Sequence, residues 1–254
     1  MRVQPYAYLK QEQDGGIQFP TLGSTLIDYW RSDQGITLSG ANVIEWEGQA
    51  NANVLEDVTT GPTVSGSNAG FNNVDTLTFN GTSSGLGKIF NNLGGSGTGD
   101  VYMMMYCAPH PSPTSGFGSI HGFSGLQGTA DFPEAIMRGQ TSSVISVWIN
   151  PDIASSDDTY GKGIYTVAVG DNDPVGMAFY NKSTTSTSAG ASFSSPYKTA
   201  RQGYTIGTYN IDLGGQLHGK VDVAGLAIFV NPPDPAARIN DQAAVEAYFK
   251  AIYG

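Results

Sequence analysis

The chain has 254 residues, of which only 13% are charged, and it carries a net charge of −10 and 34 glycines. Its 12 Lys and Arg residues are scattered, which excludes a nucleic-acid partner and an anionic membrane surface, because both require clustered positive charge. The single cysteine, Cys107, excludes an internal disulfide, and its place at the end of an apolar run indicates a core residue.

Residues 1–24 differ from the remainder because they combine several glutamines with two prolines and a Gly-Gly pair. This composition is typical of an extended arm rather than of a packed element. The arm either docks on a partner or packs on its own domain as an extra edge strand, and both interpretations stay open. Its candidate partner-binding residues are the apolar and aromatic ones: Val3, Tyr6, Tyr8, Leu9, Ile17 and Phe19.

Short apolar segments separated by turn clusters follow, and they predict β-strands without intervening helices. Alternation of apolar and polar residues indicates half-buried strands at 43–46 and 76–79. The continuously apolar run 101–107 predicts a central strand covered on both faces. Further strands are expected at 144–149, 164–169, 175–180, 204–206 and 226–230.

The last segment predicts a helix over 241–253, capped by Asn240 or Asp241. A helix of this length is marginal alone, so we expect it to dock on the sheet. The fold class is therefore all-β, a two-sheet antiparallel sandwich with a short C-terminal α-helix, in one domain over 25–254 behind the arm 1–24. One helical stripe carries the apolar side chains that would dock: Val245, Tyr248, Phe249 and Ile252.

Two stretches carry a family resemblance. Residues 26–43 (LIDYWRSDQGITLSGANV) with Trp46, and residues 243–254 (AAVEAYFKAIYG), resemble concanavalin A-like, laminin-G-type jelly-roll domains of the kind found in bacteriophage particle proteins. Residues 91–164 follow no pattern of that family, and Gly225 stands where the family commonly has an acidic residue. The resemblance implies a jelly-roll sandwich, a fold that hosts lectins, hydrolases and structural parts alike. Four shorter segments also resemble strands of that family: 76–81, 204–207, 217–221 and 226–229.

Enzymatic motifs of the same fold are absent. The laminarinase branch places its carboxylates as Glu-x-Asp-x-x-Glu on one strand, and this chain lacks that motif. Glu45 and Glu47 flank Trp46, and we interpret them as solvent-side residues of an edge strand. The three histidines form neither a serine-hydrolase triad nor a zinc pair, and are interpreted as surface or turn residues: His110, His121 and His218. No catalytic and no metal-binding residue is assigned.

Two binding sites remain as expectations. Oxygen ligands for Ca²⁺ could come from two acidic groups, Asp157-Asp158 and Asp171-Asn172-Asp173. A hairpin turn also explains the second group without any ion. No cofactor is expected. A glycan platform could be formed by aromatic residues near one polar loop, although strand aromatics are more often core residues. These are Trp148, Tyr160 and Tyr165.

The resemblance implies a non-enzymatic virion protein, and the missing catalytic motifs, the polar uncharged surface and the absence of a signal-peptide pattern at the start agree with that expectation. The expected role is a phage capsid decoration, head-fibre or tail-associated component, assembled in the host cytoplasm. Its partners would be other virion proteins, or itself as a homo-oligomer. A lectin-like module for a bacterial surface glycan, extracellular or at the cell surface, is the alternative. A glycoside hydrolase is the third hypothesis.

Overall fold

The computed structural model describes twelve stretches of the chain, and everything below refers to these. They are residues 16–91, 101–110, 117–124, 135–140, 144–149, 152–159, 161–169, 177–181, 184–188, 201–208, 218–230 and 235–254.

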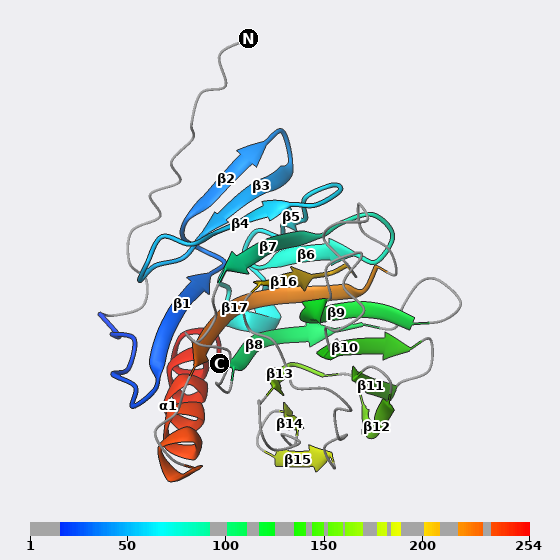
Figure 1. The fold of residues 1–254 in the computed structure, drawn as a ribbon. Coiled ribbons are helices and arrows are strands. Elements are labelled where there is room, and N and C mark those ends of the chain that lie inside the picture. Colours follow the sequence, from blue (N-terminus) through cyan, green and yellow to red (C-terminus); the bar gives the residue numbers. More distant parts are fainter. Residues whose placement is uncertain are drawn as a thin grey trace.

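The described residues form antiparallel strands, one turn of 3-10 helix, η1 (Ala69–Phe71), and one α-helix, α1 (Pro235–Tyr253) (Figure 1). The strands are β1 (Thr25–Arg31), β2 (Ile36–Ser39), β3 (Asn42–Glu47), β4 (Val54–Asp57), β5 (Thr63–Val64), β6 (Leu77–Asn80), β7 (Leu86–Asn91), β8 (Val101–Pro109), β9 (Phe117–Ser124), β10 (Ala135–Gln140), β11 (Val144–Ile149), β12 (Asp152–Thr159), β13 (Gly163–Val169), β14 (Met177–Asn181), β15 (Thr184–Ser188), β16 (Arg201–Ile206) and β17 (Lys220–Val230).

Strand pairing produces one continuous, curled antiparallel sheet. One run of pairings is β1–β17–β8–β13–β14–β15, with β6 also paired to the start of β17. A second run is β2–β3–β4–β7–β16–β9–β10–β11–β12. The short strand β5 pairs with both β3 and β6 and so joins the two runs. The expected all-β class with a C-terminal helix is confirmed at this level.

The strand β8 is covered on both faces, as its apolar run predicts. Its side chains alternate between two clusters of buried residues. Met103 and Met105 enter the main core together with side chains of β7 and β16, whereas Tyr102 and Tyr106 face the helix. The main core therefore lies between the two runs, and the second cluster lies between the first run and α1.

The helix α1 docks on β8 and β17 through its apolar stripe, which confirms the predicted docking. Phe249 is fully buried, and a Cβ at Gly225 would overlap its ring. This contact explains the glycine at position 225, because a larger residue there would displace the Phe249 ring. A shift of register between Val223 and Gly225 changes which residues of β17 face the helix.

The helix begins six residues before the expected position 241, and Pro235 is its first residue. Asp241 is therefore an interior residue and not a cap. Its carboxylate accepts hydrogen bonds from the backbone N–H groups of Gly23 and Ser24, both at 2.8 Å. The expectation that Asp241 caps the helix is therefore wrong. Asp241 lies in the second turn, and its carboxylate binds the backbone of a distant segment instead of the N–H groups at the helix start. No helix in the described ranges combines the length and apolar character needed to cross a bilayer.

Candidate functional site

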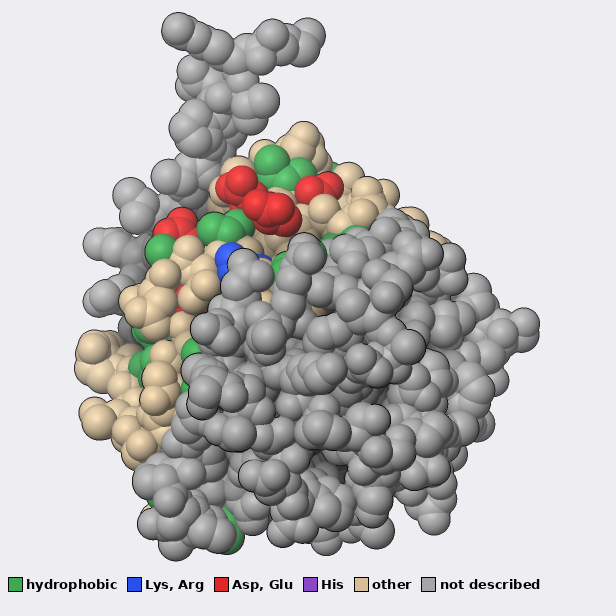
Figure 2. All heavy atoms as spheres, viewed as in Figure 1, with side chains coloured by type: hydrophobic (Ala, Val, Ile, Leu, Met, Phe, Trp, Pro, Cys, Tyr) green, Lys and Arg blue, Asp and Glu red, His purple; other side chains and the backbone are tan. Residues whose placement is uncertain are grey.

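Acidic side chains gather on the outer surface of β3 and β4 (Figure 2). Glu45 and Glu47 are exposed on β3, and Trp46 between them is fully buried. This confirms that the two glutamates face solvent with Trp46 inward. The strand is not at an edge, however, because β2 pairs with one side of it and β4 with the other.

Strand register places a third glutamate beside Glu45. On β4, Glu56 is exposed and lies directly opposite Glu45 in the antiparallel ladder. Residues opposite each other in such a ladder have Cβ atoms about 4.5–5.5 Å apart and point to the same face. Two solvent-facing carboxylates are therefore neighbours across the strands. Glu47 lies opposite Val54 instead, so it has no acidic partner in this ladder.

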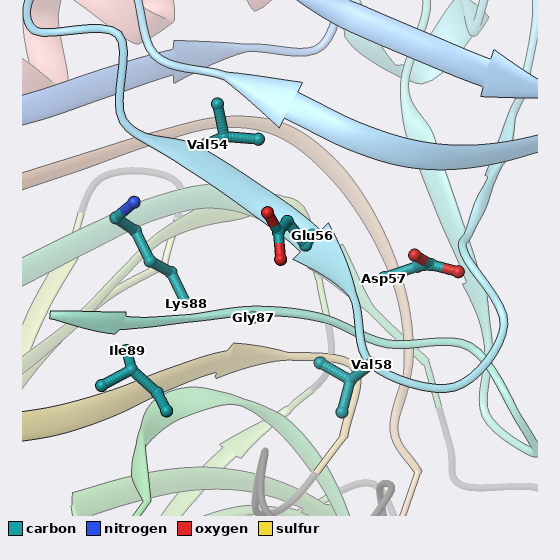
Figure 3. A pocket seen from close by; sticks show the side chains of 7 residues that line it. All are labelled: Val54, Glu56, Asp57, Val58, Gly87, Lys88 and Ile89. Atoms are coloured by element: carbon teal, nitrogen blue, oxygen red, sulfur yellow. The ribbon is translucent and has the colours of Figure 1, made fainter.

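A hollow of about 420 Å³ lies at β4 and β7, and Glu56 of this pair belongs to its lining (Figure 3). Glu56 is opposite Gly87 on β7, where the missing side chain leaves room next to the carboxylate. Carboxylates and aliphatic side chains thus share one open depression, which can offer hydrogen-bond acceptors and apolar contacts to one ligand. Its lining residues are Val54, Glu56, Asp57, Val58, Gly87, Lys88 and Ile89.

Lys88 is the one cation among these seven lining residues. It is half-buried, and its Nζ lies 5.6 Å from the centroid of the Phe90 ring, a distance suited to a cation–π contact. In Figure 3 its side chain extends away from Glu56 and Asp57.

A buried carboxylate holds the hairpin that carries Glu45 and Glu56. Asp28 of β1 is fully buried and accepts hydrogen bonds from the backbone N–H groups of Ala50 at 2.8 Å and Asn53 at 2.9 Å. The Trp30 indole donates to the carbonyl oxygens of Trp46 and Asn53, each at 3.0 Å. The connection between β3 and β4 is therefore fastened to the core, which fixes the register on which the glutamate pair depends.

The glycan candidates are placed as follows. Tyr165 lies fully buried in the main core, where its hydroxyl donates to the carbonyl oxygen of Gly161 at 2.7 Å, so its ring is not accessible to a sugar. Trp148 belongs to β11, a strand described by its backbone alone. Tyr160 lies outside the described residues.

The described part of the predicted arm packs on its own domain. Phe19 stacks on Tyr29 with ring centroids 4.1 Å apart and meets Tyr248 edge-on at 5.0 Å. Ile17 packs against the same cluster. The remaining arm candidates lie outside the described residues: Val3, Tyr6, Tyr8 and Leu9.

One histidine takes part in a polar cluster away from the hollow. His110 Nε2 lies 2.9 Å from Asp222 Oδ2, and the Thr78 hydroxyl donates to Oδ1 at 2.7 Å. Burial alone would raise the pKa of Asp222, but these two hydrogen bonds, with the charges of His110 and Lys220, outweigh it and lower that pKa. Of the other histidines, His218 Nδ1 lies 3.3 Å from the Ser84 carbonyl oxygen, and His121 belongs to β9, where its side chain is not described.

Other candidates give no additional chemistry. Cys107 is fully buried, and burial raises the pKa of its thiol. Within the described residues, no three His, Cys, Asp or Glu side chains are grouped so that they could hold a metal ion. Of the calcium candidates, Asp157 and Asp158 lie in β12, described by its backbone alone, and 171–173 lie outside the described residues.

No family model and no curated protein matches the chain. Several solved structures share its fold. A GH54 α-L-arabinofuranosidase soaked with a cyclic sulfate inhibitor gives a TM-score of 0.57 at 12% identity over 84% of this chain. A Trypanosoma rangeli sialidase in complex with sialic acid gives 0.53 at 13% identity over 92% of this chain. The chain spans 52% of the arabinofuranosidase and 34% of the sialidase, so it corresponds to about half or less of these enzymes.

These neighbours correct two expectations. They are glycoside hydrolases and not phage components, which contradicts the expected virion role and its capsid, head-fibre and tail assignments. They also contradict the expectation that the chain is not an enzyme. The absence of the Glu-x-Asp-x-x-Glu motif argues only against a carboxylate pair carried by one strand. It does not argue against a pair formed by two neighbouring strands. The structure instead brings Glu45 and Glu56 together across two strands.

Sequence reasoning did not single out Glu56 or Asp57. The segment Val54-Leu55-Glu56-Asp57 contains a short alternation with Leu55 inward, and this is a usable strand signal. The residue opposite Glu56 cannot be read from that segment, because strand register depends on a distant turn and on the core.

Proposed function

We propose that this chain is a carbohydrate-active domain of the glycoside hydrolase type that binds a saccharide in the hollow between β4 and β7. Glu45 and Glu56 are its two catalytic carboxyl groups. The observation that carries the proposal is the direct pairing of these glutamates across β3 and β4, with Glu56 lining the hollow. Glycoside hydrolysis commonly requires two carboxyl groups on either side of the scissile bond.

The proposal includes the finer architecture. The two runs of the curled sheet are the two layers of a concanavalin A-like jelly-roll sandwich, with β5 as the crossing between them. The main core, which contains side chains from both runs, supports this assignment.

The proposed chemistry follows from the direct cross-strand pairing of the two glutamates, which lets their carboxyl groups approach to about 5 Å. Carboxyl groups about 5 Å apart suit a retaining reaction, in which one acts as nucleophile and the other as acid and then base. Glu56 attacks the anomeric carbon while Glu45 gives its proton to the departing oxygen. Glu45 then takes a proton from water, and the resulting hydroxide releases the sugar from Glu56. Aliphatic side chains at the wall, Val54 and Ile89, contact the C–H faces of the sugar ring.

The test uses purified chain and a panel of aryl and oligosaccharide glycosides, including arabinofuranosides because of the arabinofuranosidase neighbour. Glu56→Gln is expected to abolish hydrolysis of every substrate that the wild type cleaves. Glu45→Gln is expected to slow natural substrates by about 10²–10⁴-fold. With 4-nitrophenyl glycosides only the first step is spared, since a good leaving group needs no proton, and a burst of 4-nitrophenol should precede slow turnover because the release of the sugar from Glu56 has lost its base.

Glu47→Gln is the matched control, because Glu47 is exposed on β3 as Glu45 is but lies opposite Val54 instead of a second carboxylate. Equal losses in Glu47→Gln and Glu56→Gln would contradict the assignment of the pair. An absence of hydrolysis across the panel by correctly folded wild-type chain would refute the catalytic proposal. Saccharide binding without turnover would reduce the function to carbohydrate binding.

A further inference from the structure

We infer that the hollow between β4 and β7 selects saccharides without negative charge and rejects sugar acids. This inference rests on the proposed function and adds the substrate class to it. It is carried by the charges of the described residues at the hollow and by the lack of an arginine among the described residues that line it.

Negative charge predominates at the hollow. Glu56 and Asp57 belong to its lining, and Glu45 and Glu47 are exposed on the adjoining strand β3. Against these four acidic groups stands one ammonium group among the described residues of the hollow, that of Lys88. The local formal charge is −3 with all four groups ionised and −2 when Glu45 carries the proton that the proposed mechanism requires. A uronate or another acidic sugar would therefore bring its carboxylate into a field of like charge.

The one cation is poorly placed to receive such a carboxylate. Recognition of a carboxylate commonly uses the two parallel donors of an arginine, and none of the seven lining residues is an arginine. Lys88 is half-buried, its ammonium contacts the Phe90 ring, and its side chain extends away from Glu56 and Asp57 (Figure 3).

The lining suits an uncharged sugar instead. Carboxylate oxygens accept hydrogen bonds from sugar hydroxyls, and neutral hydroxyls need no compensating positive charge. Three aliphatic side chains face the same depression and can contact the C–H groups of a ring: Val54, Val58 and Ile89.

The experiment compares glycosides that differ only at C6, where a neutral CH₂OH replaces a carboxylate. Aryl glucoside is paired with aryl glucuronide, and aryl galactoside with aryl galacturonide. Binding to the full chain is measured by calorimetry at low salt and at about 0.3 M salt, where screening is strong. For the pair that is recognised, we expect the acid to bind at least roughly tenfold more weakly at low salt, with a smaller difference at high salt.

Two substitutions remove charge but leave the proposed catalytic pair intact, Asp57→Asn and Glu47→Gln. Each is expected to reduce the difference in affinity between the neutral and the acidic glycoside at low salt. An acid that binds as tightly as its neutral counterpart would overturn the inference and leave the proposed function standing. A preference that does not change with salt or with these substitutions would also overturn it, because the discrimination would then come from shape. Binding of neither member of any pair would refute the proposed function, and the inference with it.

Discussion

At the scale of single residues, two carboxylates form hydrogen bonds that stabilise the fold and have no part in the proposed chemistry. Asp28 holds the connection between β3 and β4 through backbone N–H groups. Asp222 joins His110, which follows β8, to Thr78 of β6. Both differ from Glu45 and Glu56, which are exposed and face the same side of the sheet.

The lowered pKa of Asp222 predicts how its contribution to stability depends on pH. A carboxyl whose pKa is lower in the folded than in the unfolded chain stabilises the fold above its unfolded value of 3.8. That contribution is lost as the pH falls from there through the folded pKa. Asp222→Asn should therefore lower the free energy of unfolding at pH 7 by about 1–2 kcal/mol and make the wild type and the variant converge in acid.

Urea titrations between neutral and acid pH measure this difference. Asp75→Asn is a useful comparison, because Asp75 is also partly exposed and its carboxylate accepts a hydrogen bond from the backbone N–H of Ser67 at 2.7 Å. A wild-type to variant difference that stays constant down to pH 2, or that grows on acidification, would contradict the assigned role of Asp222.

At the scale of elements, α1 is the clearest test of the packing. Phe249 is fully buried between α1 and β17, so Phe249→Ala should remove about 3–5 kcal/mol from the free energy of unfolding. The measurement is chemical unfolding followed by circular dichroism. Ala247→Ser, at an exposed position of the same helix, should change stability by no more than about 0.5 kcal/mol. An unchanged midpoint for Phe249→Ala would mean that the helix does not dock as described.

At the scale of the whole molecule, the segment before β1 and the helix near the end of the chain pack against each other in one cluster. Phe19 contacts Tyr29 and Tyr248, while Asp241 binds the backbone at Gly23 and Ser24. Residues more than two hundred positions apart therefore stabilise each other, and the described end of the predicted arm is part of this packing.

Phe19→Ala tests this connection. Loss of one stacked and one edge-on aromatic contact, with partial burial, should lower the free energy of unfolding by about 1–3 kcal/mol. Gln18→Ala is the matched control, since Gln18 is adjacent and exposed. If thermal melts of the two variants coincide, residues 16–24 do not contribute to the stability of the domain.

Local patterns alone determined much of the fold. Alternation of apolar and polar residues placed Trp46 inward and the flanking glutamates outward, and the unbroken apolar run of β8 required cover on both faces. The stripe around Phe249 identified a docked helix. These features depend on residues close together in the sequence, because the direction of a side chain follows from the period of its own element.

The tertiary structure alone decided which residues meet. Three contacts join segments that are far apart in the sequence. Glu45 pairs with Glu56, and Phe249 packs on Gly225. Asp241 accepts a hydrogen bond from the backbone N–H of Gly23. Strand register and helix docking are set by the packing of the whole core and by turn geometry, and no local period encodes them. For that reason the sequence identified outward glutamates on β3, whereas only the fold supplied the second carboxylate and the hollow beside it.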